Sequence, residues 1–517
     1  AGDTSGARSL LERAIAAAPD EADYHALLGW TLFRAGPADA NAALAAAASL
    51  RAAFDIERDH VDAHDYAGRI AVATGDDAGA LDHLARVLDA DPTRKEALVG
   101  FESAAQRAGE FRTLERQYRK LIHRLNEAYS VERAVILWWR LAELYRTRLD
   151  DKPSAKVAYE IAAKLAPDDP RPREALARML SDDPHAWEAA AQAMRESWRL
   201  APDDPDPGRA LFKLHHDGER WDAAYTVAAA LSVRGAGSEA SNAFLKRHRP
   251  RFLVRAQQPI HDSTAWIDKV RHPDDDRDLS QLFARIFAVW QPPFDFAALG
   301  VKPDDALDSN LLPLSFGRVL GYCAHQLGVA APPVYRRGDF ASDTHVGAAR
   351  PPILLAGPQA LALGDTTALA FRIGRALAFL LPGRAAVGAL PARQLKQTLL
   401  ATLTLATPSL RVDDADGEIA RLRAQISAAA PHLVRDVAPL CERVLAGSQA
   451  QLNLSRYARA IARTADRVGL VLCNDLAVAV RIVMAGGAPG AENDLIDFAL
   501  GDSYLAARQA LGLAVAV

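Results

Sequence analysis

Two histidines have a spacing that could serve a metal ion. His60 and His64 lie four residues apart, with Asp62 between them. On a helix, residues i and i+4 share a face and could bind one metal ion together. No Glu follows His60, however, and the segment begins a helix of an ordinary repeat. The sequence therefore favours a pair of surface histidines over a metal site.

Two further groups of polar residues could carry acid–base or metal chemistry. His215 and His216 are adjacent and precede Gly218, so they are predicted to lie in a loop. The run 274–278 holds four aspartates around one arginine. Neighbouring residues on a helix point in different directions and seldom converge on one ion. We therefore expect this acidic run to cap a helix over residues 279–290, where negative charge is favourable.

The common motifs for covalent or nucleotide chemistry are absent from the sequence. It contains no G-x-S-x-G elbow, no G-x-x-x-x-G-K-[ST] loop and no strand followed by G-x-G-x-x-G. Counting residues does not exclude a Ser/His/Asp triad, because its geometry defines it. The run Gly486–Gly490 follows a helix and is predicted to be a loop. Cys323, Cys441 and Cys473 lack C-x-x-C spacing, which favours buried, reduced thiols.

Composition limits the class of protein. The 517 residues carry a formal net charge of −4, half of them are hydrophobic, and 24% are charged. This balance excludes wholesale disorder and is a poor match to a nucleic-acid binder, which usually has a basic domain. No apolar run reaches the roughly 18 residues that a membrane span needs. The chain begins at Ala1, which is compatible with processing or with missing upstream sequence. We expect a cytoplasmic protein without cofactor or metal.

A recurrent helix-ending tag indicates internal repeats. Prolines preceded by Ala or Asp occur at Pro19, Pro92, Pro167 and Pro202. The last two are about 35 residues apart and the other intervals are close to twice that, which matches the period of about 34 in tetratricopeptide helical hairpins. Each hairpin has an apolar face that it buries by stacking on its neighbours. The sequence predicts about six hairpins over residues 1–247.

Residues inside the units agree with this period. In the second unit Gly68 lies in the first helix, Gly75 makes the turn, and Ala80 and Leu84 follow in the second helix. Small residues at these offsets let paired helices approach closely, as in the tetratricopeptide pattern that the units resemble. A generic array of α-hairpins remains the alternative. Beyond a basic boundary at Arg247–Arg255 the repeat signal stops, and residues 248–304 are predicted to be a linker with connecting helices.

From residue 305 the pattern changes to a mixture of helices and short strands. A helix over Leu311–Leu327 precedes Pro333-Val334-Tyr335, and Ile353–Ala356 is predicted to be a short buried strand. The helix that follows, Thr367–Leu381, is apolar on most sides, so we expect it to be central and buried. A second apolar helical stretch runs from Tyr457 to Ala485.

This order of elements resembles the catalytic domain of the CAAX-prenyl-endopeptidase type of zinc metallopeptidases, a gluzincin family. In that family a P-x-V-Y strand and a short strand precede a buried H-E-x-x-H helix, and a later helix carries E-x-x-A-D-R-x-G. Here Pro333-Val334-Tyr335 matches the first strand, and 465–470 (A-D-R-V-G-L) matches the later motif. The resemblance covers roughly residues 305–485. It implies a helix-rich α+β domain with a small sheet over residues 305–517.

The catalytic positions of the family are replaced in this chain. On the matched register the two zinc-binding histidines become Arg375 and Phe379, the general base becomes Ala376, and the third ligand becomes Ala462. Zinc needs deprotonated N, O or S donors, normally three from the protein in a catalytic site. Arginine is a permanent cation, and alanine and phenylalanine carry no donor. The resemblance therefore implies a degenerate peptidase domain with no catalytic, metal or cofactor-binding residues.

Arg375 needs a partner if it points inward from an apolar helix, since a buried unpaired charge is costly. Asp466 lies on the other matched helix. We expect a structural ion pair between them at the abandoned metal position, and solvent exposure of Arg375 is the alternative.

The sequence as a whole predicts a mostly α protein that does not catalyse a reaction. Its repeats would present a groove to a protein or peptide partner, and its peptidase-like domain would serve as a scaffold. An extended chain could pair with the sheet edge at Ile353–Ala356. The alternatives are a hydrolase with a non-standard site and a structural subunit of a larger assembly. The sequence sets neither the partner nor the oligomeric state.

Overall fold

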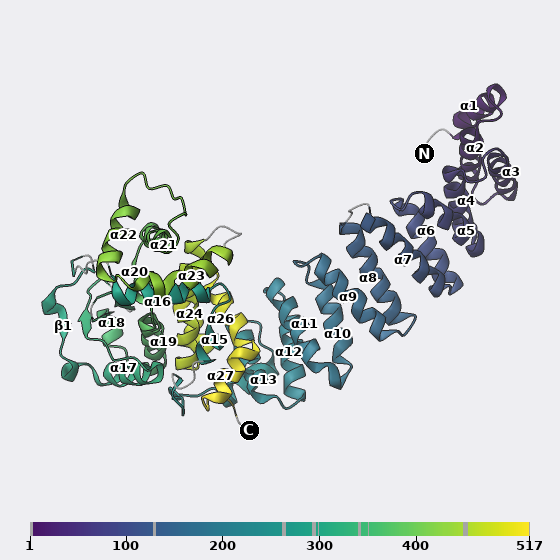
Figure 1. The fold of residues 1–517 in the computed structure, drawn as a ribbon. Coiled ribbons are helices and arrows are strands. Elements are labelled where there is room, and N and C mark those ends of the chain that lie inside the picture. Colours follow the sequence, from purple (N-terminus) through teal and green to yellow (C-terminus); the bar gives the residue numbers. More distant parts are fainter. Residues whose placement is uncertain are drawn as a thin grey trace. The chain divides into compact units, whose positions relative to one another are not determined.

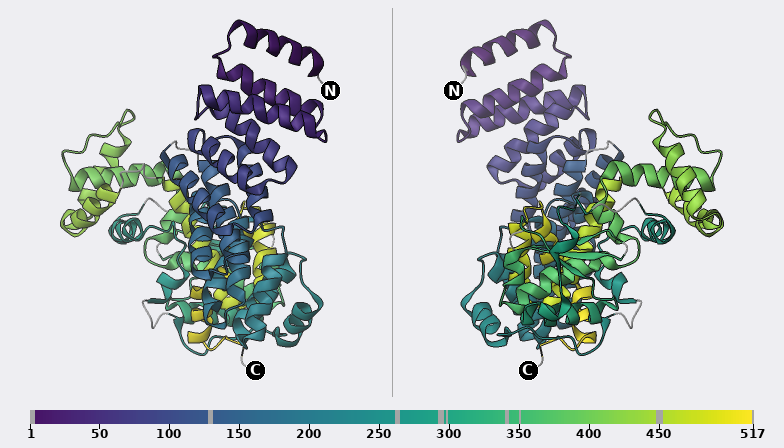
Figure 2. Two further views of the ribbon diagram at one scale, coloured as in Figure 1. Left: turned by 90° about the vertical axis from the view of Figure 1, so that its right-hand side faces the viewer. Right: turned by 90° about the vertical axis from the view of Figure 1, so that its left-hand side faces the viewer.

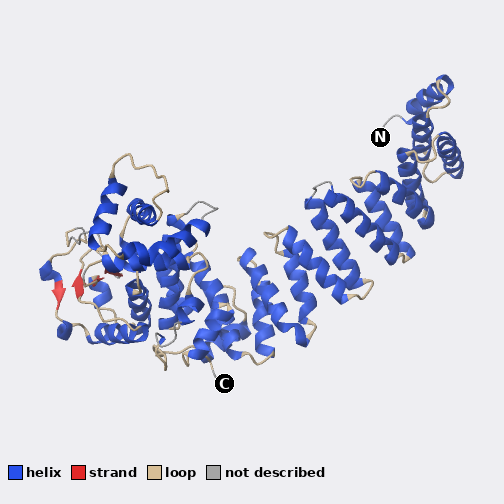
Figure 3. Cartoon of the chain, in the orientation of Figure 1, coloured by secondary structure: helices blue, strands red, loops and turns tan. Residues whose placement is uncertain are grey.

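The computed structural model describes residues 4–127, 131–260, 265–291, 296–297, 299–339, 343–349, 351–447 and 453–515. The chain is divided into two compact units, Ala1–Ala201 and Pro202–Val517. The described residues of the first unit are helices and turns, and the second unit contains the strands (Figure 3).

The first unit is a stack of helical hairpins. Its helices are α1 (Thr4–Ala17), α2 (Ala22–Ala35), α3 (Ala40–Ile56), α4 (Val61–Thr74), α5 (Asp77–Ala90), α6 (Lys95–Ala108), α7 (Phe111–Glu127), α8 (Val131–Thr147), α9 (Lys152–Leu165), α10 (Arg171–Ser181) and α11 (Trp187–Leu200). Consecutive helices pack in pairs, and each pair packs on the next, as α2 does on α4 and α5 does on α6 (Figures 1 and 2).

The sequence explains both the ends and the close packing of these helices. Pro19, Pro92 and Pro167 each follow the last residue of a helix by two positions, since α1, α5 and α9 end at residues 17, 90 and 165. Asp76 caps α5 by accepting the Gly79 backbone N–H at 3.0 Å. These local signals are the ones that the period of the repeats predicts.

Small residues permit the approach within the hairpins. A Cβ atom on Gly68 would lie 2.5 Å from Leu84 Cδ2, so only glycine lets α4 and α5 come this close without rearrangement. Ala80 and Leu84 are fully buried in the same interface.

The second unit begins with the last hairpins of the chain and continues into a helix-rich region. Its main helices are α12 (Asp206–Asp217), α13 (Trp221–Val233), α14 (Glu239–His248), α15 (Ala265–Val270), α16 (Arg277–Val289), α17 (Leu314–Leu327), α18 (Pro358–Leu361), α19 (Thr366–Leu377), α20 (Arg384–Ala389), α21 (Ala392–Ala406), α22 (Glu418–Ala429), α23 (Leu433–Gly447), α24 (Leu454–Cys473), α25 (Leu476–Ala485), α26 (Ala491–Ala499) and α27 (Asp502–Ala510). A 3-10 turn, η5 (Ala378–Leu380), extends α19.

The hairpin over residues 206–233 belongs to the second unit, because α13 packs on α25 and α26. The basic segment after α14 also docks within this unit: Arg249 forms two hydrogen bonds to the Asp475 carboxylate, at 2.8 and 3.0 Å. The predicted end of the repeats at residue 247 stays a prediction. The boundary between the two compact units lies between Ala201 and Pro202.

A small mixed sheet lies on one side of the second unit, with strand order β1-β2-β4-β3 (Figure 3). The strands are β1 (Ala306–Leu307), β2 (Val334–Arg336), β3 (Thr344–Gly347) and β4 (Ile353–Ala356). β4 pairs in parallel with β2 and antiparallel with β3. The prediction that Ile353–Ala356 offers a free sheet edge is therefore wrong: both of its sides are occupied by neighbouring strands, which also explains why all four of its residues are buried.

Helix α19 is central to the second unit, as its apolar sequence predicts. It packs on α17, α24, α25 and β3. Gly469 of α24 allows a close approach to the α19 backbone, since a Cβ there would lie 2.9 Å from the Phe371 carbonyl oxygen. The second apolar stretch is two helices rather than one, because Asn474 adopts a left-handed conformation with φ of 54° between α24 and α25.

The predicted fold class is confirmed: the chain is mostly helical, with repeated hairpins and a small sheet in its C-terminal region. In the described part of the chain, no helix is long and apolar enough to cross a membrane.

Candidate functional site

The two residues expected to form a structural ion pair, Arg375 and Asp466, come from α19 and α24. Arg375 Nε lies 2.6 Å from Asp466 Oδ1, close enough for an ion pair but not aligned for a hydrogen bond. Arg463 Nη1 approaches the other carboxylate oxygen at 3.8 Å. Burial raises the pKa of Asp466, and the two arginines oppose that rise.

The other three positions that the resemblance aligned with zinc ligands or the general base carry no polar side chain. Ala376 is buried in α19, Phe379 lies in η5 and packs against the apolar cluster of α16 and α20–α24, and Ala462 lies on α24. None of them can bind a metal or move a proton. Among all described residues, no group of three or more His, Cys, Asp or Glu side chains is placed to hold a metal ion.

A second set of charges lies beside this pair, at the start of β3. Asp343 accepts a hydrogen bond from His345 at 3.0 Å, and Arg372 Nη1 of α19 lies 3.7 Å from its other oxygen. Burial alone would raise the pKa of Asp343, but His345, the Thr344 backbone N–H and Arg375 outweigh burial and lower it to about 2. We call Arg372, Arg375, Arg463, Asp343 and Asp466 the arginine cluster. Of these five residues, the sequence predicted only Arg375 and Asp466. Asp343 was missed because neither it nor the following strand, β3, lies in a motif.

The acidic run before α16 does cap that helix, but through one residue. Asp276 accepts the Leu279 backbone N–H at 2.9 Å. Asp274 instead pairs with Arg456 at 2.6 Å, and Asp275 is buried among hydroxyl groups and Arg384. The three carboxylates point to different partners, which agrees with the expectation that they do not converge on one ion.

The histidine predictions need correction. His60 and His64 do not form a surface pair, because both are buried. His60 caps α4 by accepting the Ala63 backbone N–H at 3.1 Å, and its other ring nitrogen contacts Asp23 at 2.9 Å. His215 and His216 lie inside α12 rather than in a loop. The helix continues through them because the turn begins only at Gly218.

His64 pairs with a histidine of the next helix. Its Nδ1 lies 2.8 Å from Nδ1 of His83, and its Nε2 lies 3.1 Å from the Arg58 carbonyl oxygen. A carbonyl only accepts, so Nε2 of His64 carries the proton. Nδ1 of a neutral His64 therefore accepts a hydrogen bond from Nδ1–H of His83. Protonation of both rings would place two N–H donors against each other.

This pair predicts an acid-sensitive first unit. Burial lowers the pKa of His64 and of His83, and the charges that face them are Arg86, Asp82 and, for His83, Asp76. A base whose pKa is depressed by folding stabilises the protein above its unfolded pKa of about 6.5 and loses that contribution as pH falls. We expect the free energy of unfolding of the first unit to fall by about 1 kcal/mol, the value of one hydrogen bond, between pH 7 and pH 5.

Urea unfolding at several pH values, followed by hydrogen exchange of peptides from α4 and α5, would measure this effect. His83→Gln keeps a donor toward His64 but removes one titrating ring. The free energy of unfolding of this variant should therefore depend less on pH. An equally steep dependence in His83→Gln would show that other groups cause it.

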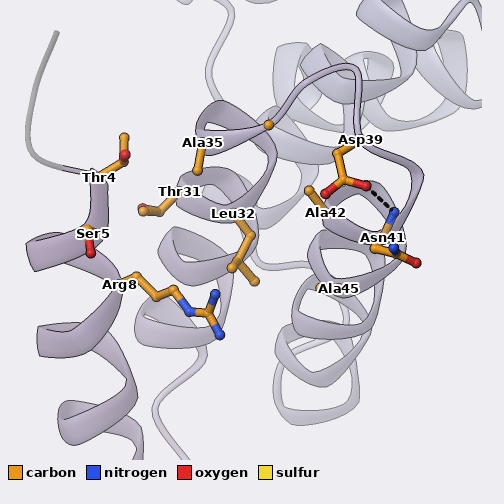
Figure 4. Close-up of a pocket in the computed structure, with 11 residues that line it drawn as sticks. Thr4, Ser5, Arg8, Thr31, Leu32, Ala35, Asp39, Asn41, Ala42 and Ala45 are labelled. Carbon is orange, nitrogen blue, oxygen red and sulfur yellow. Dashed lines mark hydrogen bonds between the residues drawn. The ribbon is translucent and has the colours of Figure 1, made fainter.

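The described part of the first unit also has hollows between its helices. One, of about 450 Å³, lies among α1, α2 and α3, where Arg8 reaches toward Leu32 and Asp39 caps α3 through the Asn41 N–H (Figure 4). A second, of about 430 Å³, lies among α9, α10 and α11.

The third hollow, which we call the Trp139 groove, has the most aromatic lining. It holds about 410 Å³ between α6, α7 and α8. Trp139 packs edge-to-face on Tyr159 with ring centroids 5.6 Å apart, and Arg148 lies 5.3 Å above the Phe111 ring. Glu102 accepts a hydrogen bond from Tyr118 at 2.7 Å. Its walls are therefore held in place before any partner arrives. The sequence alone did not single out Trp139, because adjacent tryptophans in a repeat are usually core.

Comparisons with known proteins are limited to the helical fold. No family model matches the chain, and no curated protein matches it. Among solved structures, Pseudomonas aeruginosa pilF is 15% identical with a TM-score of 0.25, covering 44% of this chain and 97% of its own. The P58(IPK) TPR domain is 15% identical with a TM-score of 0.18, covering 48% and 96%. These scores are too low to carry an argument about function, and no comparison supports the peptidase resemblance.

Proposed function

We propose that this chain is a non-catalytic interaction protein whose hairpin array binds a peptide or protein segment. The Trp139 groove is the observation that carries the proposal. Interface energy is concentrated in a few Trp, Tyr and Arg side chains in well-packed surroundings. Trp139, Arg140 and Arg148 all line the groove, between packed helices. A groove whose side chains are already ordered loses less entropy when it binds.

The second unit is proposed to be a scaffold with a peptidase-like arrangement and no peptidase chemistry. Support comes from the replaced positions, which present Arg375 and three apolar residues where the resembled family has ligands and a base. If this unit also pairs with an extended chain, that chain must use β1 or β3, the outer strands of the described sheet.

A peptide-display selection against the full chain tests the first proposal. Selected peptides should lose at least tenfold in affinity on Trp139→Ala, because removing a hot-spot side chain costs more than about 1.4 kcal/mol. Leu44→Ala is the matched control, since Leu44 is a large apolar residue that is 70% exposed on α3 and does not line this groove. Peptides that bind both variants equally well would refute the assignment of the groove.

The metal content of the purified full chain tests the second proposal. Elemental mass spectrometry without added metal should find less than about a tenth of a zinc ion per chain, because three protein donors are normally needed. Near one zinc ion per chain, together with cleavage of a quenched fluorescent peptide, would overturn the proposal in favour of a hydrolase.

A further inference from the structure

Arg372 of α19 is an arginine with almost no partner. Its side chain is 15% exposed, and the carboxylate oxygen nearest to it, on Asp343, is 3.7 Å away, too far for a hydrogen bond. Its Nε is buried and has no hydrogen-bond acceptor among the described residues. A guanidinium offers five N–H donors, and leaving such a charge partly buried without acceptors is costly.

Arg375 lies one turn further along the same helix and has a similar deficit. Its side chain is 26% exposed, and its one close contact, to Asp466, is not aligned for a hydrogen bond. The two guanidinium groups are near enough for Arg375 to lower the pKa of Arg372, a shift caused first by burial. Two like charges thus lie near each other on one helix, and each has a buried Nε without a hydrogen-bond partner among the described residues. Both side chains are partly exposed to solvent.

The net charge of the arginine cluster indicates which ligand charge would neutralise it. Apart from His345, which donates to Asp343, three arginines face two carboxylates, which leaves one positive charge. The nearby Asp494 is matched by Arg467. The neighbouring Arg481 is balanced by Asp365, 4.0 Å away. A single monoanion would neutralise the cluster, whereas a phosphate dianion would leave it negative. Two guanidinium forks also match the planar, two-oxygen geometry of a carboxylate.

We propose that the arginine cluster is a binding site for a carboxylate group of a peptide, held by Arg372 and Arg375. Either a chain-terminal carboxylate or an Asp or Glu side chain supplies this chemistry. The site lies in the second unit and is independent of the peptide groove of the first unit, so either assignment can fail without the other.

The direct test uses small probes on the full chain at constant ionic strength. Calorimetric titration with N-benzoylglycine, which has a free carboxylate, should saturate at one site per chain. N-benzoylglycinamide, in which the carboxylate is an uncharged amide, should bind at least tenfold more weakly, since its binding lacks the charge-assisted hydrogen bonds. Inorganic phosphate should bind more weakly than N-benzoylglycine. Equal binding of acid and amide, or tighter binding of phosphate, would overturn the proposal.

Two peptides that differ only at one central residue and at the C-terminus identify the source of the carboxylate. One has a free C-terminus and no acidic side chain, and the other is amidated and carries one central Asp. Preference for the first assigns the site to chain ends, and preference for the second assigns it to acidic side chains. Binding of neither peptide would overturn the proposal.

Arg372→Met separates a binding role from a structural one. Removal of a structural arginine lowers stability, whereas removal of a partly buried, unpaired charge should leave the unfolding midpoint of the ligand-free protein unchanged or raise it. The same variant should bind N-benzoylglycine at least tenfold more weakly and lose the stabilisation that this probe gives the wild type.

The matched control is Arg285→Met, which removes an exposed arginine of α16 outside the cluster. It should retain wild-type binding of N-benzoylglycine. A lowered midpoint with unchanged binding in Arg372→Met, or equal loss of binding in Arg285→Met, would show that Arg372 is not part of a carboxylate site.

Discussion

Arg508→Met is expected to lower the free energy of unfolding of the second unit by about 3 kcal/mol. Arg508 is 1% exposed, and its Nε and Nη2 donate to the Asp222 carboxylate at 2.8–3.1 Å. Removing one partner of a buried pair costs about 3–5 kcal/mol, because the other charge is left unpaired. We expect the lower end of that range, since Asp222 is 17% exposed and can recover some hydration.

The loss of stability in Arg508→Met should be largest in the segments that Arg508 connects. Arg508 lies on α27 and Asp222 on α13, and Arg508 also donates to the Leu513 carbonyl oxygen at 2.9 Å and to Asn474. Urea unfolding read by hydrogen exchange should show early exposure of peptides from 206–233 and 491–513. Arg421→Met breaks an exposed pair with Glu418 on α22 and should cost less than about 1 kcal/mol.

A double variant separates the lost ion pair from lost packing. Arg508→Met combined with Asp222→Leu removes both charges, so most of the stability should return, as it does where buried pairs are replaced by apolar residues. If the double variant is as unstable as the sum of the single variants, the ion pair is not the cause of the loss.

The parts of this fold that could be predicted are those set by local signals. Pro167 ends one hairpin and Gly68 lets two helices approach, and each acts through residues within about one repeat of itself. The apolar sequence of α19 indicates a buried helix for the same reason, since a helix that is buried on most sides has few polar residues.

The sequence did not predict most of the ion pairs between residues that lie far apart in the chain. Asp222 and Arg508 are 286 residues apart in sequence, and neither stands in a motif. The His64–His83 contact spans only one hairpin, so the two facing positions of a paired helix could have suggested it. Arg375 and Asp466 were expected to lie near each other because the order of elements and one short motif, at residues 465–470, suggested which helices face each other. Arg372 lies in no motif. Its role depends on β3, whose position the sequence pattern did not give.

Asp275→Asn is the second substitution with a large expected effect, a loss of about 3–5 kcal/mol from the second unit. Asp275 accepts hydrogen bonds of 2.8 Å from Ser280, Thr464 and Arg384. These groups join α16, α20 and α24, and Arg384 is itself buried, so that the neutral amide would leave its charge uncompensated. Asparagine also presents an NH₂ group in place of one acceptor oxygen, so the Ser280 hydroxyl, which donates to Asp275, would have to turn and accept instead.

Asp274 provides the control for Asp275→Asn, because the two neighbouring aspartates differ in burial rather than in chemistry. Asp274→Asn breaks an exposed pair with Arg456, which is 64% exposed, and should cost no more than about 1 kcal/mol. Urea unfolding of the two variants should therefore separate by about 2 kcal/mol or more. Equal midpoints would show that water reaches Arg384 when its carboxylate is lost. A clear separation would show that the acidic run serves two purposes, with Asp276 starting a helix and Asp275 joining three of them.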